Sequence, residues 1–219
     1  MTVSRHHVIA LIGATLTSTI ALSGAVVGGV TGRELSLPNL RAGWTVAIIL
    51  VHGFTYAALS WVLICERARL ERANRFARAV RYVLLASLGV LAIGFVLVAP
   101  VMEIAKVPPT GPVGIAWGWI ASIGFAGMII SSLLLGVAVL RNNPLGYGGR
   151  LLLLLVPVLG ATVLLGFIDS HWAHPGYVET VIHFGVALIG VRAAAATTTK
   201  STSSTDTEPE NRQTVLDMS

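Results

Sequence analysis

Apolar residues in this chain are gathered into six long runs that are joined by short polar connections. A helix needs about 20 residues to cross a hydrocarbon core of about 30 Å, and each run comes close to that length. Because backbone N–H and C=O groups find no water in lipid, each run is expected to be a helix. The six predicted spans are Val8–Val30, Gly43–Cys65, Tyr82–Met102, Val113–Leu140, Leu151–Ile168 and Gly176–Val191.

The pattern therefore predicts an all-α, polytopic membrane protein, with a bundle of six transmembrane helices within residues 1–192. The fifth and sixth runs are short, and the sixth lengthens into the following alanines if Arg192 extends its charge to the headgroups. Arg5 ahead of the first run is also a feature of signal peptides, although this run is long for one and lacks a clear cleavage site. The tail, residues 193–219, is rich in Thr and Ser and is expected to be disordered and cytoplasmic.

The distribution of positive charge predicts the orientation of the spans. With the N-terminus inside, the inner segments hold twelve Lys and Arg residues and the outer loops hold three. Because cytoplasmic loops carry the excess of Lys and Arg, both termini are expected inside (N-in, C-in) in a cell membrane.

Composition narrows the function classes. Hydrophobic residues make up 54% of the chain and charged residues 11%, whereas soluble domains carry roughly 25% charged residues. The net charge of +5 follows the predicted topology, so a nucleic-acid partner is not expected. The single cysteine, Cys65, allows no disulfide within the chain. The expected partners are the lipid bilayer and its anionic inner headgroups, together with a second copy of the chain or other membrane subunits.

The inner connection after Cys65 carries arginine at every third position. A period of three drifts around a helix of 3.6 residues per turn, so these charges spread over a broad face. We expect this segment to lie on the inner headgroups, where each arginine contributes roughly 1 kcal/mol against anionic lipid. Docking of an acidic partner is the alternative. The residues expected to contact headgroups are Arg69, Arg72, Arg75, Arg78 and Arg81.

Small residues spaced four apart mark two helices for close contact, because helices in lipid approach each other through such positions. We expect both stripes to be contacts within the chain, with a homodimer seam as the alternative. The first stripe is Gly24, Gly28 and Gly32, and the second is Gly114, Gly118, Ser122 and Ala126.

Ionisable residues are costly inside a membrane and are therefore functional candidates. At 1.5 Å per residue, His52 is expected about 13 Å and His183 about 12 Å below the outer surface, so the two could share a layer. Glu179 and His183 are four residues apart and share one helix face, as do His52 and Tyr56. If these faces turn inward, they line a ligand or proton-relay pocket that opens outward, with Glu103 near its mouth. Each residue alone also has a structural explanation, such as a hydrogen bond to a neighbouring carbonyl.

Metal binding is a weaker alternative. Asp169, His171 and His174 offer oxygen and nitrogen ligands for zinc or copper, although their spacing arises easily by chance. His52 and His183 at equal depth resemble a pair of axial haem ligands. No catalytic residue is assigned and no cofactor is predicted; haem or a divalent metal is the alternative.

Three functions are therefore compatible with the sequence. The first is a non-catalytic membrane subunit, scaffold or small-molecule binder, because the chain has no nucleophile motif, P-loop or strong metal signature. The second is a proton-coupled small-solute transporter that uses Glu179 and His183, since histidine titrates near neutrality. The third is a haem- or metal-binding membrane protein that uses His52 and His183.

The predicted topology is tested by reporter fusions. A reporter placed after Lys106 should lie outside and one placed after Ser219 should lie inside, because the charge distribution puts three spans between the two sites. The measurement is the activity of compartment-specific reporters, and equal compartments for the two fusions would contradict the six-span arrangement.

Overall fold

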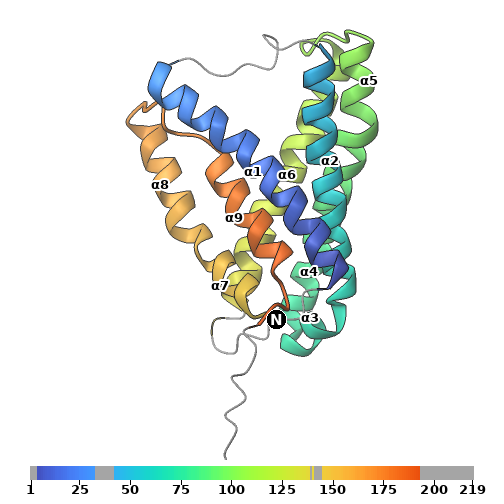
Figure 1. Cartoon of the computed structure of the whole chain (residues 1–219), viewed down its shortest axis with the longest axis vertical. Helices are drawn as coiled ribbons and strands as arrows, with labels where there is room; N and C mark the ends of the chain where they lie inside the picture. Colours follow the sequence, from blue (N-terminus) through green and yellow to red (C-terminus); the bar gives the residue numbers. More distant parts are fainter. Residues whose placement is uncertain (1–3, 33–41, 139, 141–144, 193–219) are drawn as a thin grey trace, which may run out of the picture.

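The computed structural model describes residues 4–32, 42–138, 140 and 145–192, which form helices joined by short connections and contain no strand. The helices run up and down in a bundle (Figure 1). They are α1 (Arg5–Thr31), α2 (Ala42–Cys65), α3 (Arg67–Ala73), α4 (Arg75–Ile93), the π-helical segment η2 (Gly94–Val98), α5 (Ala99–Ile104), α6 (Pro112–Ala138), α7 (Tyr147–Leu153), α8 (Leu155–Phe167) and α9 (Gly176–Ala187).

Five helical stretches of the described residues are long and apolar enough to cross a membrane. The all-helical expectation is confirmed, and these stretches match the first five predicted runs with shifted ends. The fifth is interrupted at Leu154, three residues before Pro157, because proline removes one helical hydrogen bond and crowds the preceding turn. The five stretches are Arg5–Thr31, Gly43–Cys65, Arg75–Ile104, Pro112–Ala138 and Tyr147–Phe167.

The sixth predicted run contains only a short helix. Helix α9 has 12 residues, so it is about 18 Å long and cannot cross a 30 Å core by itself. The residues before it are not helical and follow α1 instead: a Cβ on Gly32 would lie 3.4 Å from His171 Nε2, and one on Gly24 would lie 3.7 Å from His174 Nε2. Helix α9 then begins beside Ala21. The count of six transmembrane helices is therefore not confirmed.

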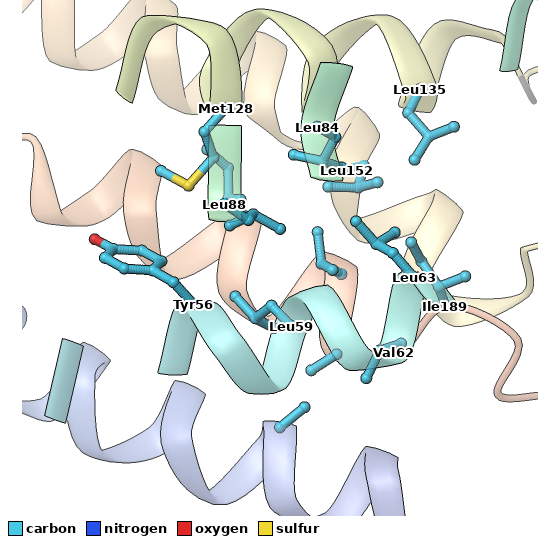
Figure 2. Packing of buried hydrophobic residues seen from close by; sticks show 14 of the residues in the cluster. Tyr56, Leu59, Val62, Leu63, Leu84, Leu88, Met128, Leu135, Leu152 and Ile189 are labelled. Atoms are coloured by element: carbon cyan, nitrogen blue, oxygen red, sulfur yellow. The ribbon is translucent and has the colours of Figure 1, made fainter. Parts of the chain in front are cut away.

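The core lies where α2, α4, α6, α7 and α9 meet (Figure 2). It consists mainly of buried leucine side chains packed against one another, together with Met128 and the ring of Tyr56. Because lipid is as apolar as leucine, the gain from this core comes from close packing rather than from leaving water. Helix α1 lies outside this centre, packed against α2 and α9. The two helices that carry the candidate residues, α2 and α9, are thereby held side by side.

The arginine-rich connection folds into two helices that meet at Asn74. The backbone of Asn74 is extended, and its side chain accepts a hydrogen bond of 2.6 Å from the N–H of Ala77, which begins α4. Leu70 and Ala77 are fully buried, so one side of this connection belongs to the core.

Two of the five arginines expected on the headgroups are held within the protein. Arg69 forms an ion pair with Glu66, and Arg81 is buried 3.4 Å from Oε1 of Glu71. A hydrogen bond from Arg67 holds the pKa of Glu71 below its usual range, so this carboxylate stays charged at neutral pH. Headgroup contact stays a prediction for the three exposed arginines, which are Arg72, Arg75 and Arg78.

The two predicted stripes of small residues differ in whether they contact another part of the chain. The stripe on α1 lies against the non-helical residues before α9, in agreement with a contact inside the chain. In the stripe on α6, Gly114 is buried against Pro108 and Pro109, whereas Gly118 has no atom within 4 Å of an added Cβ, and Ser122 and Ala126 are exposed. Helix α6 meets α4 through Gly124 and Gly127 instead, because α6 is turned to put those glycines against Leu91 and Ser87.

Two glycines allow close contacts around η2. A Cβ on Gly53 would lie 2.9 Å from the carbonyl carbon of Phe95 and 2.7 Å from Cγ2 of Val96. Across η2, the ring of Trp117 occupies the space where Gly94 would carry a side chain. The contact of α2 with η2 therefore requires glycine at position 53, and the contact of Trp117 with η2 requires glycine at position 94.

We expect Gly53→Leu to destabilise the protein by about 1–3 kcal/mol, because the new side chain would meet the η2 backbone, which cannot move aside. The matched control is Gly118→Leu, whose new side chain points into open space. Thermal unfolding in detergent measures both variants. Equal stability of the two would show that the α2–η2 contact is looser than described.

Candidate functional site

A chain of polar side chains joins three helices inside the bundle. The hydroxyl of Tyr56 on α2 donates a hydrogen bond of 2.5 Å to Oε1 of Glu179 on α9. One turn further along α9, Nε2 of His183 lies 3.5 Å from the same oxygen. On its other side, Nδ1 of His183 lies 2.9 Å from Oγ1 of Thr17 on α1. We call Thr17, Tyr56, Glu179 and His183 the polar chain.

Local structure places each member. Glu179 and His183 are four residues apart, so the helix puts both on the face that α1 and α2 cover. Tyr56 and His183 are fully buried, Thr17 is almost so, and the side chain of Glu179 is 18% exposed. The ring of Tyr56 meets the imidazole of His183 edge-on at 5.5 Å between centroids. The chain is therefore enclosed except at the Glu179 carboxylate.

The polar chain can adopt two protonation states in which the contact between Thr17 and His183 is kept, whereas Nε2 of His183 has no hydrogen-bond partner and only the 3.5 Å contact with Glu179. If Nδ1 of His183 lacks a hydrogen, the Thr17 hydroxyl donates to it, and Nε2 carries the hydrogen that faces Glu179. If both ring nitrogens carry hydrogens, the Thr17 hydroxyl turns to the carbonyl of Gly13, 3.0 Å away, and accepts from Nδ1. The second state holds one proton more and pairs an imidazolium with a carboxylate.

His52 lies next to the polar chain but is bonded within its own helix. Its Nδ1 donates to the carbonyl of Ile48 at 2.9 Å. Its ring lies 6.5 Å from the ring of Tyr56 and 6.2 Å from that of Phe95. Because Tyr56 contacts both imidazoles, the structure brings His52, Tyr56, Glu179 and His183 into one neighbourhood, while a pocket that opens outward at these residues stays a prediction.

Thr17 lies near the middle of α1, and His183 is bonded to it, so the polar chain lies at the level of the middle of that helix. Helix α9 begins beside Ala21 of α1, which sets this level. The expected depth below the outer membrane surface stays a prediction.

The remaining candidates lie apart from the polar chain. Glu103 forms an exposed ion pair with Lys106 at 2.8 Å. His171 lies beside Gly32, and Nδ1 of His174 accepts a hydrogen bond of 3.0 Å from the N–H of Gly176. Among the described residues, Asp169, His171 and His174 are not among the groups whose ligand atoms gather closely enough for a metal ion.

Sequence reasoning missed two features. Thr17 was overlooked because a lone threonine in an apolar helix usually bonds to its own backbone, as Thr15 and Thr19 do. His6, His7 and Glu66 were overlooked because they precede the first run and follow the second. Their positions at the ends of consecutive runs could have revealed them, because two consecutive antiparallel helices bring the start of the first beside the end of the second.

Comparisons with known proteins found no match. No family model, no curated protein and no solved structure matches this chain. A functional conclusion therefore has to come from the geometry of the polar chain and its surroundings.

Proposed function

We propose that this chain is a non-catalytic, multi-pass protein of a cell membrane that binds a proton at the Glu179–His183 pair and couples that proton to the packing of α9. The proposal keeps the N-in, C-in orientation and takes residues 169–191 as the sixth crossing, made of a non-helical segment followed by α9. Proton-coupled transport of a small solute is the class of function that uses such a site.

The observation that supports the proposal is the enclosed contact of Glu179 with His183 and Tyr56. A lone carboxylate removed from water costs several kcal/mol, which an apolar residue at this position would avoid. Tyr56 offsets part of that cost with its hydrogen bond, and a proton shared with His183 offsets more by making the pair neutral. The site is therefore built to exchange one proton.

Protonation at this position acts on the contact between α9 and its neighbours. His183 is bonded to α1 through Thr17, and Glu179 is bonded to α2 through Tyr56. When the pair loses its proton, an uncompensated negative charge lies where three helices meet. The partly exposed carboxylate is the route by which water reaches it. Helix α9 is short and follows non-helical backbone, so it is the element with freedom to shift.

Glu179→Gln tests this function. Glutamine keeps the size of the side chain and an oxygen that accepts from Tyr56, but it cannot hold the proton. His183 alone, enclosed without a carboxylate, is expected to remain neutral. We expect the purified variant to take up one proton fewer than the wild type between pH 8 and pH 5, and its pH-difference infrared spectrum to lack the carboxyl and imidazole bands of the pair.

The control is Glu103→Gln, which removes an equivalent carboxylate from an exposed ion pair at the end of α5. Its infrared difference spectrum should keep the bands of the pair. If Glu179→Gln retains those bands, the pair does not exchange a proton, and the polar chain is a structural contact between helices.

Binding of an apolar small molecule is a second candidate, favoured by a groove of about 550 Å³ between α4 with η2 and α6. Its volume lies in the range of small-molecule sites. Trp117 lines the groove and contacts Phe95 at 6.0 Å between ring centroids, and Phe95 contacts Tyr56 at 5.7 Å. The groove thus borders the polar chain through two aromatic rings. Its lining is Val90, Ile93, Gly94, Val98, Pro112, Val113, Ala116, Trp117 and Ile120.

Ala116→Trp should weaken binding of a fluorescent polyene fatty acid by about tenfold, or about 1.4 kcal/mol, because the indole fills part of the groove. Ile123→Trp is the control, since Ile123 is exposed on the same helix and lies outside the lining. Titration of the probe into protein in detergent measures both. Equal affinity for the two variants would place the probe elsewhere.

A further inference from the structure

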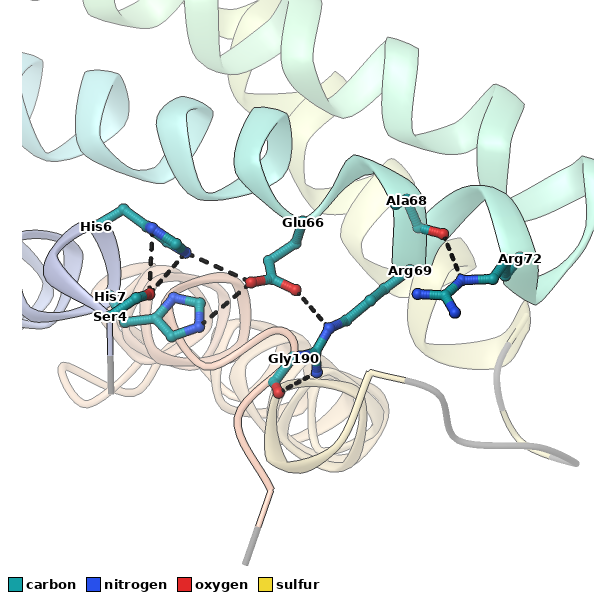
Figure 3. A network of polar contacts seen from close by, with 8 residues as sticks. All are labelled: Ser4, His6, His7, Glu66, Ala68, Arg69, Arg72 and Gly190. Atoms are coloured by element: carbon teal, nitrogen blue, oxygen red, sulfur yellow. Dashed lines mark hydrogen bonds and ion pairs between the residues drawn. The ribbon is translucent and has the colours of Figure 1, made fainter. Parts of the chain in front are cut away.

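A second polar cluster lies where α1 begins and α2 ends (Figure 3). It consists of His6 and His7 in the first turn of α1 and Glu66 directly after α2. One ligand atom of each of these three residues lies within 4.8 Å of the others. From this arrangement we infer that His6, His7 and Glu66 bind a divalent first-row transition metal ion, of which zinc is the best match.

The distances are close to those that a metal requires. Nε2 of His6 lies 3.4 Å and Nε2 of His7 lies 3.7 Å from Oε1 of Glu66. Ligands about 2.0–2.1 Å from a tetrahedral zinc ion are about 3.3 Å from one another. Both contacts are longer than good hydrogen bonds, and they need to shorten by only a few tenths of an ångström around an ion. The ligand atoms of His6 and His7 lie within 4.8 Å of each other, so the two rings would have to move closer together.

His7 makes this cluster difficult to explain as a hydrogen-bond network. The side chain of His7 is only 5% exposed, and its Nδ1 has no hydrogen-bond partner. Its Nε2 points toward Glu66 at a distance too long to satisfy the ring. A buried imidazole with an unpaired nitrogen is costly, and coordination of an ion by Nε2 would offset part of that cost with one strong interaction, although Nδ1 would still have no hydrogen bond.

Arg69 prepares Glu66 for this role. Its Nε donates to Oε2 of Glu66 at 2.9 Å, and its guanidinium also donates to the carbonyl of Gly190 after α9. The two carboxylate oxygens therefore have separate partners, because Oε2 faces Arg69 and Oε1 faces the two imidazoles. A carboxylate that binds a metal through one oxygen is commonly oriented by a hydrogen bond to its surroundings, and Arg69 supplies that contact.

The ligand set selects the class of ion. Two imidazoles and one carboxylate suit zinc and neighbouring first-row ions, whereas calcium and magnesium prefer oxygen ligands alone. Three protein ligands leave one position of a tetrahedral ion open for water. An ion here would fasten the start of α1 to the end of α2 and, through Arg69, to the end of the sixth run.

The test uses the full chain purified in detergent without a polyhistidine tag. Cobalt(II), which occupies zinc sites and absorbs visible light, is titrated first and then displaced with zinc. We expect one equivalent of cobalt, a ligand-field band that zinc removes, and a higher unfolding temperature with zinc. Absence of binding at micromolar cobalt would show that the cluster is only an ion-pair contact and would overturn the inference.

Two double variants identify the ligands. His6→Ala with His7→Ala should lower cobalt affinity by more than about tenfold and abolish the band. His171→Ala with His174→Ala removes the same number of histidines from the outer loop and should leave both unchanged. Glu66→Gln, which keeps the shape of the side chain, serves where the first double variant does not fold. Loss of the band only in the outer-loop variant would assign the ion to that loop and overturn the inference.

Discussion

A polar side chain inside an apolar bundle must find its partner within the protein, and this constraint decides where α9 lies. His183 and Glu179 have no water around them to satisfy their polar atoms, apart from the partly exposed edge of the carboxylate. Their partners are Thr17 on one neighbouring helix and Tyr56 on the other. Sliding α9 by one turn, about 5.4 Å, would break both contacts.

The same helix pair, α1 and α2, carries polar clusters at two depths. At mid-bundle, Thr17 and Tyr56 hold the two ionisable residues of α9. At one end, His6, His7 and Glu66 meet beside the last residues of the sixth run. The short helix α9 and its continuation are therefore tied to α1 and α2 at both places. A change of charge at mid-bundle would act on an element whose far end is held by Arg69.

In the other half of the bundle, two glycines allow close packing around η2. Gly53 and Gly94 allow α2 and Trp117 to reach η2 from opposite sides. The π-helical turn widens the helix locally and precedes Pro100, whose ring cannot continue a regular helical ladder. Phe95 within this turn contacts Trp117 on one side and Tyr56 on the other. The irregular segment therefore lies between the apolar groove and the polar chain.

Hydropathy alone was sufficient to predict the class of fold and the first five long helices, because lipid forces every long apolar run to satisfy its own backbone. The i, i+4 spacing was likewise sufficient to put Glu179 beside His183, since it depends only on helical geometry. Helix α9 begins at Gly176 as predicted and ends at Ala187, before the predicted end of the sixth run. Its offset along α1 could not be predicted, because hydropathy carries no information about the relative height of two helices. Tertiary packing also decided that Gly118, Ser122 and Ala126 of the α6 stripe are exposed, since composition marks small residues without saying which way a helix is turned.

Thr17 and the cluster of His6, His7 and Glu66 illustrate the same limit. The sequence shows that these residues lie in or beside apolar runs, but local spacing does not indicate which residues they contact. The partner of Thr17 is 166 residues away, and the partner of the two histidines, Glu66, follows the end of α2. Such pairings depend on the rotation and vertical offset of whole helices, which are set by the sum of many packing contacts and therefore appear only in the tertiary structure.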